Sequence, residues 1–415
     1  MSVKVFFLCL ALLVLAARLL LDWFNLQYQK QNGGELPPAF ASKIDAERLQ
    51  RSREYSRAKG LLGLVEEGGG GLLTLIFLFS ALFPWYDQYI RSFASGPLSE
   101  GLLFFGLIVL LQGLLGLPFS LYRNFVLEAR FGFNRMSFGL WCADLLKSLL
   151  VGGVLFVLLV GGALLLVQSF PQSWWLWVWG FWAMLTLFLL YLSPVLIEPL
   201  FFKMSPLKSE ALAEQVRLLL IKVGLQAGKV LQVDASRRSG HSNAYFTGIG
   251  RVKRVVFFDT LLEQLNEKEL LAVLAHELGH WQCGHIRQRL IKGQVVVLAC
   301  CYGSFLLLQK QSLTGWFGFD ELSFAGQVLL LGWFGSLIGF FWTPVSSWWS
   351  RRQERQADNF AVDLVGGGQD LATGLVRLAK ENLSQLQPHP LYSRIYYSHP
   401  PLLERVAWLE KQTKK

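Results

Sequence analysis

Long apolar runs separated by shorter polar stretches dominate the pattern along the chain. A helix needs about 20 apolar residues to cross a bilayer of about 30 Å, and several runs reach that length. The first run follows Lys4 as a signal peptide would, but it is long and no small-residue cleavage site precedes Trp23, so we expect a retained helix. We predict about seven transmembrane helices, at residues 4–22, 71–86, 101–121, 148–168, 174–197, 291–309 and 325–346.

Two segments are too polar to cross a membrane. The first, residues 203–290, contains a helical pattern at 211–223 and apolar β-like stretches at 230–233 and 252–258. The fold class is therefore a mainly α membrane protein with a smaller α+β part. Its regions are residues 1–202 with five transmembrane helices, 203–290 with an α+β domain, 291–346 with a transmembrane hairpin, and 347–415 with the helical remainder of that domain.

Glycine-rich stretches are the clearest breaks in the helical pattern. They lie at residues 68–71 and 366–368, and we predict a loop at each because glycine is a poor helix former.

Composition supports a membrane protein and excludes a nucleic-acid-binding one. Hydrophobic residues make up 53% of the chain and charged residues 16%, with 15 Trp. The net charge is +10, but the basic residues lie in the loops between apolar runs. The spans are nearly free of charge, which argues against a transporter or channel. None of the five cysteines forms a CxxC pair, so a cysteine metal site is not indicated.

The loops alternate between basic-poor and basic-rich. Residues 87–100, 169–173 and 310–324 contain only Arg91 and Lys310 as basic residues. The stretches between them are rich in Lys and Arg, and by the positive-inside rule these basic-rich stretches are cytoplasmic. The polar segments at 203–290 and 347–415 belong to this cytoplasmic set.

Residues 276–280 read His276-Glu277-Leu278-Gly279-His280. On a helix, His276 and His280 lie one turn apart and can bind one metal ion, while Glu277 is placed to activate a water molecule. Asn266 is a suitable N-cap for this helix. The alternative interpretation is a surface helix that carries two histidines.

A zinc site needs a third protein ligand, and the candidates are His285, His389, His399 and the carboxylates. A metzincin pattern is excluded, because Cys283 and Ile286 occupy its glycine and third histidine positions. We predict Glu354 as the ligand, on a separate helix just past the last span. Asp358, one turn further on, would accept a hydrogen bond from a ligand imidazole. For the Glu354 segment, the alternative is an exposed helix with Glu–Arg pairs. His285 would either contact a metal ligand without binding the metal itself or be a polar residue near the start of the sixth span.

Further motifs make the chain resemble the type 1 CaaX prenyl proteases, which are integral-membrane zinc metalloproteases of the gluzincin type. The resemblance implies seven helices around a large intramembrane chamber, capped on the cytoplasmic side by a zinc domain, with one zinc ion per chain. The motifs are residues 125–128 with 131–134, 199–201 with 205–207, 236–246, the HExxH helix, the Glu354 helix and 398–401.

The resemblance also implies roles for individual residues. His276, His280 and Glu354 would bind zinc, and Glu277 would be the general base and acid. Asn243 and His399 match positions that hold the substrate or stabilise the oxyanion, although alone they would be read as a turn and a loop residue. Arg405 would form a salt bridge near the site or bind the substrate carboxylate. The substrate would lie extended along Asn243, Ala244, Tyr245 and Phe246 and bond by β-addition.

The predicted function is a membrane-embedded zinc endopeptidase. Its partners would be membrane lipid and a prenylated CaaX-type or membrane-associated peptide or protein, with no nucleic acid. Phe202 stands where the family commonly has Asn, and the chain shows no dilysine retrieval signal. We therefore expect a bacterial inner-membrane homologue that clips membrane proteins, or an endoplasmic-reticulum protein if the source is eukaryotic. The alternatives are a heat-shock membrane protease of the HtpX kind, a non-catalytic scaffold and a transporter.

Overall fold

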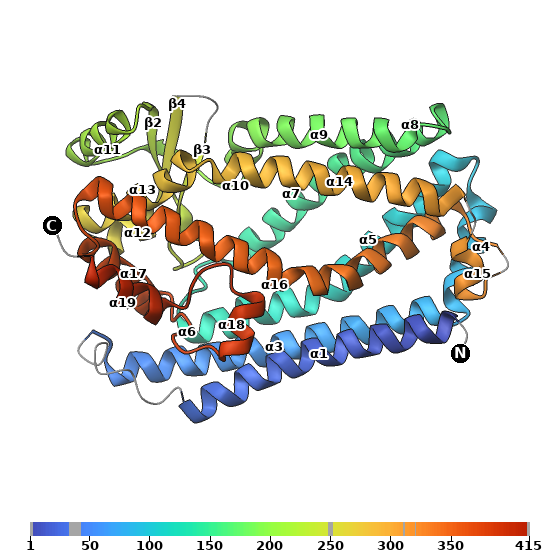
Figure 1. The fold of residues 1–415 in the computed structure, drawn as a ribbon, viewed down its shortest axis with the longest axis horizontal. Helices are drawn as coiled ribbons and strands as arrows, with labels where there is room; N and C mark the ends of the chain where they lie inside the picture. The colour runs from blue at the N-terminus through green and yellow to red at the C-terminus, as the bar shows by residue number, and fades with distance from the viewer. Residues whose placement is uncertain (1–2, 33–42, 248–251, 310–311, 320, 413–415) are drawn as a thin grey trace.

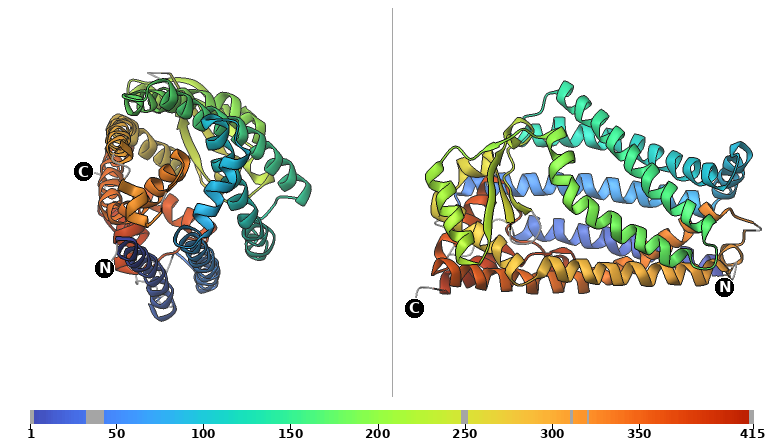
Figure 2. Two further views of the ribbon diagram at one scale, coloured as in Figure 1. Left: turned by 90° about the vertical axis from the view of Figure 1, so that its right-hand side faces the viewer. Right: turned by 90° about the horizontal axis from the view of Figure 1, so that it is seen from above.

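The computed structural model describes residues 3–32, 43–247, 252–309, 312–319 and 321–412. Long helices run the length of the molecule, and a small β-sheet with several short helices lies at one end (Figure 1). Viewed along that axis, the long helices are arranged as an open ring (Figure 2, left). The predicted fold class is confirmed.

Seven helical segments of the described chain are long and apolar enough to cross a membrane. Four of them are single helices, and the other three each contain a π-helical turn. The segments are α1 (Val3–Asn32), α3 (Ala46–Phe79), α5–η1–α6 (Pro97–Tyr122, Arg123–Glu128, Ala129–Phe131), α7–η2–α8 (Phe138–Phe156, Val157–Gly161, Gly162–Ser169), α9–η3–α10 (Trp174–Leu192, Ser193–Ile197, Glu198–Phe201), α14 (His285–Gln309) and α16 (Phe324–Val365).

The prediction of a loop at residues 68–71 is wrong. These glycines lie inside α3, which continues to Phe79. A Cβ on Gly71 would lie 2.6 Å from Leu15 Cδ1, so the missing side chain lets α1 approach α3 closely. Each glycine costs a helix only about 1 kcal/mol, whereas a break at membrane depth would leave backbone N–H and C=O groups without partners. The loop predicted at 366–368 is confirmed, because Gly366 has a φ of +78° and ends α16.

Helix α16 joins the last span to Glu354, and nothing between residue 347 and Gly366 interrupts it. Glu354 therefore lies on a helix separate from the one that carries His276 and His280, as predicted. Its 42 residues extend over about 60 Å, roughly twice the thickness of the hydrocarbon core. One rigid element therefore connects the membrane region with the polar end of the molecule.

The polar end contains a four-stranded sheet with the order β1-β2-β4-β3. The β2–β4 pair is parallel, the outer pairs are antiparallel, and β3 lies at an edge. Helices pack around it and share one apolar core with it. The strands are β1 (Met204–Pro206), β2 (Gln226–Val233), β3 (Ala244–Thr247) and β4 (Val252–Phe258), and the helices are α11 (Glu210–Lys222), η4 (Ala235–Arg237), α12 (Asp259–Gln264), α13 (Glu267–Gln282), α17 (Gln369–Glu381), α18 (Pro390–Tyr396) and α19 (Leu402–Lys411).

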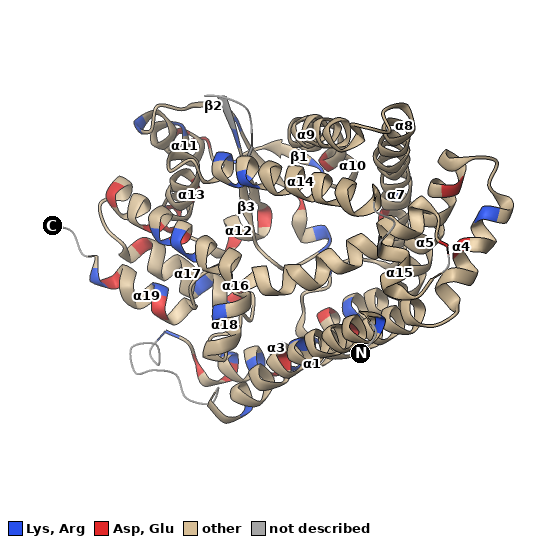
Figure 3. Ribbon diagram, turned by 45° about the vertical axis from the view of Figure 1, so that its right-hand side comes forward, with Lys and Arg blue, Asp and Glu red and all other residues tan. Residues whose placement is uncertain are grey.

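Charge is distributed unevenly over these elements (Figure 3). Helix α9 contains no Asp, Glu, Lys or Arg, as predicted for a span. Helices α1 and α3 nevertheless carry Arg18 and Glu67, which form an ion pair of 3.5 Å, and Glu67 lies before the span predicted at 71–86. These side chains line a cavity rather than an outer surface, and a polar wall is where charge inside a membrane region is tolerated.

The end away from the sheet is closed by α4 (Leu82–Phe93) and α15 (Ser312–Phe317), next to the start of α1 (Figure 1). The side chain of Asp87 on α4 is fully buried there. It accepts hydrogen bonds from Arg91, with Nη2–Oδ2 at 2.7 Å, and from the backbone N–H and hydroxyl of Ser323. Ser323 is the N-cap of α16, so this carboxylate connects α4 to the start of the longest helix.

Replacing Asp87 by Ala should lower the stability of this end. The substitution leaves the Arg91 guanidinium and the Ser323 N–H without their buried acceptor, and breaking such a pair typically costs about 3–5 kcal/mol. Thermal unfolding in detergent should therefore occur at a clearly lower temperature than in the unmodified protein. Glu321→Ala is the matched control, because the Glu321 side chain is 82% exposed and lies 3.5 Å from Arg91. Equal melting temperatures for the two variants would contradict the structural role of Asp87.

Candidate metal centre

Helix α13 begins where the sequence predicts. The Asn266 side chain accepts from the backbone N–H of Glu269, and the Glu269 carboxylate accepts from the N–H of Asn266, both at 3.0 Å. This reciprocal pair satisfies two N–H groups that the first turn leaves unbonded. The prediction of Asn266 as the N-cap is confirmed.

Helices α13 and α16 cross in direct contact at Gly279. A Cβ at this position would lie 2.8 Å from Ala357 Cα and 2.9 Å from Ala357 O, so any side chain larger than hydrogen would push the helices apart. Gly279 lies between the two histidines of the motif, and Ala357 lies one turn after Glu354. The contact therefore brings the two predicted halves of the site together.

Three side chains from these helices converge on one point. His276 Nε2 and His280 Nε2 are 3.3 Å apart, His276 Nε2 lies 3.3 Å from Glu354 Oε2, and His280 Nε2 lies 3.2 Å from Glu354 Oε1. Two ligand atoms of a tetrahedral zinc ion, each bound at about 2.1 Å, are about 3.4 Å apart. The observed spacing is that of the edges of a zinc tetrahedron.

The chemistry of the three groups also fits a divalent cation. Glu354 is only 2% exposed, and its Oε2 atom is buried without a well-aligned hydrogen bond. The two imidazole nitrogens face each other at a distance where their lone pairs repel unless a proton or a cation lies between them. A buried carboxylate beside two such nitrogens is a suitable set of metal ligands, so these residues could hold zinc.

His276 is oriented by Asp358, as predicted. Its Nδ1 atom lies 2.8 Å from Asp358 Oδ1, so a proton on Nδ1 leaves the Nε2 lone pair free. Burial lowers the pKa of His276, but hydrogen bonds to Asp358 and Glu354 outweigh that effect and hold the pKa above its ordinary value. Asp358 is 1% exposed, so its interpretation as a solvent-facing residue is excluded.

Arg405 on α19 supports this carboxylate. Its Nε and Nη2 atoms donate to Asp358 at 2.7 and 2.6 Å, and its side chain is 9% exposed. Of the two roles expected for Arg405, the structure shows the salt bridge near the site. The other expectation, that it binds the substrate carboxylate, stays a prediction, for which the Nη1 atom is the one without a hydrogen bond to Asp358.

His285 orients the second histidine, a role that the sequence left open. Its Nδ1 atom lies 3.0 Å from His280 Nδ1, and its Nε2 atom lies 2.9 Å from Gln356 Oε1. A proton on His285 Nε2 donates to Gln356, so His285 Nδ1 can accept the proton of His280 Nδ1. The His280 Nε2 lone pair is then free, as it is in His276. Gln356 was not predicted, because a glutamine on a helix carries no signal of such a contact.

Glu277 and His399 flank the three convergent groups. The Glu277 carboxylate is half-buried and makes no hydrogen bond or ion pair to any residue that the structure describes. His399, in the segment between α18 and α19, places Nδ1 2.7 Å from Glu354 Oε2 while its side chain stays 59% exposed. The structure thus brings His399 to the site from a position more than a hundred residues away from the HExxH helix.

Asn243 lies at the start of edge strand β3 and does not contact the three convergent groups. Its side chain is exposed, and its Oδ1 atom accepts from the N–H of Ala244 at 2.9 Å. Along β3, Ala244 and Phe246 pack against the core that contains α13, whereas the Tyr245 hydroxyl donates to Glu198 on the other side. Tyr245 can therefore contribute to a substrate site only through its backbone.

Two motifs of the sequence hold β3 in place. Gly240 donates to the carbonyl of Phe133 at 2.9 Å, and the His241 ring stacks on the Phe133 ring with centroids 4.1 Å apart. His241 also lies 3.3 Å from Glu128, which accepts from the Tyr55 hydroxyl at 2.7 Å. The loop after α6 thus fixes the segment that leads into Asn243, a contact between distant motifs that the sequence did not reveal.

Comparison with known proteins covers nearly the whole chain. Residues 25–203 match the family model described as CAAX prenyl protease N-terminal, five membrane helices, and residues 206–413 match that of peptidase family M48. CAAX prenyl protease 1 of Saccharomyces cerevisiae is 35% identical over 94% of this chain and 91% of its own length. The CAAX prenyl protease 1 homolog of Homo sapiens is 31% identical over 90% of this chain and 88% of its own length. The crystal structure of S. mikatae Ste24p superimposes with a TM-score of 0.91 and 30% identity, over 99% of each chain.

Removing the carboxylate of Glu354 should remove the metal. Purified protein is expected to contain about one zinc ion per chain, and Glu354→Ala should lose most of it because two imidazoles alone make a weak site. Elemental analysis after gel filtration measures the content. Glu277→Gln is the matched control, since it changes a neighbouring carboxylate that is not among the convergent groups. Full zinc content in Glu354→Ala would refute the assignment.

Asp358→Ala should weaken zinc binding without abolishing it. The substitution frees His276 to rotate and to change tautomer, and loss of such an outer hydrogen bond typically costs about 10- to 100-fold in metal affinity or activity. Competition with a chromogenic chelator measures the affinity, and added zinc should restore part of the occupancy. An unchanged zinc affinity would show that the ligand does not need this support.

Proposed function

Because the chain belongs to peptidase family M48, in the branch with a CAAX prenyl protease membrane domain, we propose that it is a zinc-dependent endopeptidase for CaaX-type prenylated polypeptides. That it is an integral membrane peptidase follows from the family and from the seven spans. What we propose beyond the family is that the metal is zinc, that the residues named below form the active site, and that the substrates are CaaX-type prenylated polypeptides. The relatives that match over most of the chain carry the substrate class in their names.

The observation that carries the proposal is the convergence of His276, His280 and Glu354 at zinc-edge distances, with a free carboxylate beside them. These three residues would hold the ion. A zinc ion at such a site acts as a Lewis acid, which acidifies water and polarises a carbonyl oxygen. All other steps are assigned to side chains of this chain.

Glu277 is assigned as general base and acid. A base must have a lone pair available at the reacting water, and the Glu277 carboxylate is not engaged by any described residue. It accepts the proton from the attacking water and then delivers it to the leaving amine. Its half-buried position in the helix turn that carries both histidines keeps it beside the reaction.

His399 is assigned to stabilise the developing oxyanion. Its contact with Glu354 holds the ring beside a proposed metal ligand, while the exposed part of the ring remains open to substrate. An imidazole N–H placed there can donate to the carbonyl oxygen as negative charge develops, which lowers the barrier to attack.

The substrate is assigned to the free edge of β3. This strand is paired on one side only, antiparallel to β4, so among described residues its other edge is open to a further strand. An extended peptide there gains backbone hydrogen bonds, and the exposed Asn243 amide lies at the start of that edge. Asn243 would thus hold the peptide in register rather than take part in the bond cleavage.

Glu277→Gln should nearly abolish turnover while the protein keeps its zinc. The amide has a similar shape but cannot accept the proton, and a general base contributes about 100- to 10,000-fold. Cleavage of a farnesylated CaaX peptide, with an unprenylated peptide as control, is followed by mass spectrometry. A variant with near-normal turnover, or one that has lost its zinc, would contradict the role.

The end with the metal centre should face the cytoplasm. The loops at that end are basic-rich, whereas residues 87–100 contain one basic residue, Arg91. In a background whose five cysteines are replaced, Ser95→Cys should react with an impermeant reagent added outside intact cells, and Arg237→Cys should not. Both positions are exposed, and Ser95 lies between α4 and α5 whereas Arg237 lies in η4 between β2 and β3. The reverse labelling pattern would invert the topology.

A further inference from the structure

A cavity of about 890 Å³ lies between α1, α3 and the C-terminal segment around α18. Many of the side chains in its wall carry a polar or charged group. On α1, the side chains of Arg18, Asp22, Asn25 and Gln29 line it at spacings of three or four residues, so one face of a membrane-length helix carries a polar stripe. Four tyrosines line it as well: Tyr55, Tyr392, Tyr396 and Tyr397.

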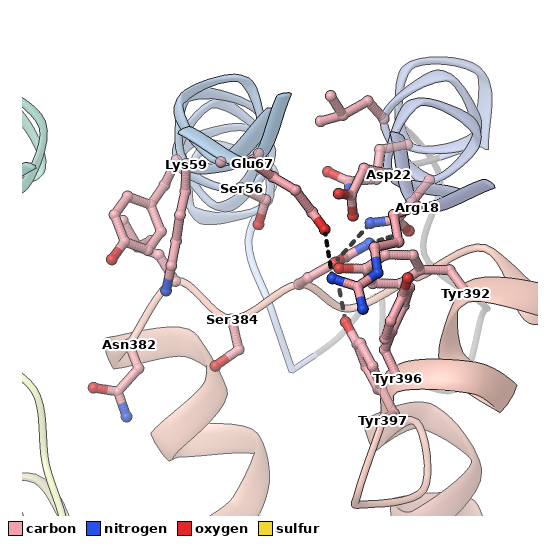
Figure 4. A pocket seen from close by; sticks show the side chains of 18 of the residues that line it. Arg18, Asp22, Ser56, Lys59, Glu67, Asn382, Ser384, Tyr392, Tyr396 and Tyr397 are labelled. Carbon is pink, nitrogen blue, oxygen red and sulfur yellow. Dashed lines mark hydrogen bonds and ion pairs between the residues drawn. The ribbon is translucent and has the colours of Figure 1, made fainter. Parts of the chain in front are cut away.

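The cavity contains two carboxylates close to one guanidinium. Asp22 and Glu67 line the same cavity, and Arg18 pairs with Glu67 at 3.5 Å. Figure 4 shows these side chains turned towards one another, with Lys59 on the other side of the cavity. Lys59 lies 5.7 Å from the Tyr55 ring and forms no ion pair with any described residue, so it does not neutralise the carboxylates. Two adjacent carboxylates with one cation leave a place for a second cation.

The Gln29 side chain is a second, independent observation, because it places an acceptor without a protein donor at the cavity wall. This side chain is 7% exposed and lines the cavity, yet its Oε1 atom is buried and accepts no hydrogen bond. A buried acceptor without a donor costs about 1–3 kcal/mol, so it is normally satisfied by an ordered water or by a bound group that displaces that water. The neighbouring Asn25 is not free in this way, because it bonds Gln385 at 2.9 Å.

The cavity lies next to the metal centre. Tyr397 lines it and stands two residues before His399, while His241 lines it and stands two residues before Asn243. Arg351 on α16, one turn before the Glu354 ligand position, donates to the carbonyl of Tyr397 at 2.7 Å. A polypeptide that passes the metal centre can therefore place a side chain in this cavity.

We propose that the cavity binds a basic side chain of the polypeptide substrate, with Asp22 and Glu67 as its counter-charges. The tyrosine rings would contact the cation or its aliphatic stem, and Gln29 would accept one of its N–H groups. Charged groups at Arg18, Asp22 and Glu67 favour a charged side chain over a hydrocarbon chain at this wall. The proposal rests on the peptidase function of the metal centre.

Peptides that differ in one charge test this inference. Lys is moved through the six positions on either side of the scissile bond, and each peptide is compared with its norleucine counterpart, which has a similar length but no charge. At one position or a few neighbouring positions, kcat/KM should be about tenfold higher for Lys, the size expected of one charge-assisted hydrogen bond. Equal rates for Lys and norleucine at every position would overturn the proposal.

Variants of the two cavity carboxylates then test whether they cause the preference for Lys over norleucine. In Asp22→Asn and Glu67→Gln, the ratio of kcat/KM for the Lys and norleucine peptides should fall close to one. Glu66→Gln is the matched control, because Glu66 neighbours Glu67 in sequence but pairs with Arg123 outside the cavity, and the ratio should be kept. A ratio that survives in both cavity variants would overturn the proposal.

A second pair of variants tests the cavity in case the carboxylate variants do not fold. A Cβ on Gly63 or Gly69, both in α3, meets no atom within 4 Å, but only Gly63 lines the cavity. Gly63→Phe should weaken binding of a fluorescent Lys peptide about tenfold or more, whereas Gly69→Phe should not. Zinc content and melting temperature report the fold. If the protein cleaves no peptide, the peptidase assignment fails. Equal binding of the Lys peptide by Gly63→Phe and Gly69→Phe would overturn the cavity assignment, whatever the outcome for the peptidase activity.

Discussion

The contact between α13 and α16 is the constraint on which the site depends. Gly279 has no side chain, and a Cβ there would overlap the backbone of Ala357. This close approach brings the HExxH turn to the turn that carries Glu354. Since α16 is one helix of 42 residues, the same element also crosses the membrane region. The position of the third ligand group is therefore coupled to the packing of the last span.

Around this contact, each histidine is held in one tautomer by its own partner. His276 is bonded to Asp358, which Arg405 fixes from α19, and His280 is bonded to His285, which Gln356 fixes from α16. Both chains of bonds leave an Nε2 lone pair directed to the same point. Both rings therefore carry their proton on Nδ1, although different residues hold it there. A metal ion binds the neutral imidazole through the Nε2 lone pair that this tautomer leaves free.

The membrane region shows how polar groups are accommodated at membrane depth. Four charged side chains of α1 and α3, namely Arg18, Asp22, Lys59 and Glu67, line a cavity, while α9 carries no charge at all. Placing Arg18 and Glu67 on an inner wall avoids the cost of exposing them to lipid. The charged groups in the wall suit the cavity to a charged side chain of a polypeptide, and the cavity includes Tyr397, two residues before His399.

Local sequence determined the features that depend on residues close together along the chain. The number of spans, the Asn266 cap, the turn at Gly366 and the one-turn spacing of His276 and His280 all follow from helix geometry and side-chain chemistry. Only the tertiary structure decided the rest. Gly68–Gly71 stays helical because α1 packs against it, Arg405 is occupied because Asp358 lies beside it, and His285 orients His280 because Gln356 accepts its proton. These outcomes depend on partners far away in sequence, which no local pattern encodes.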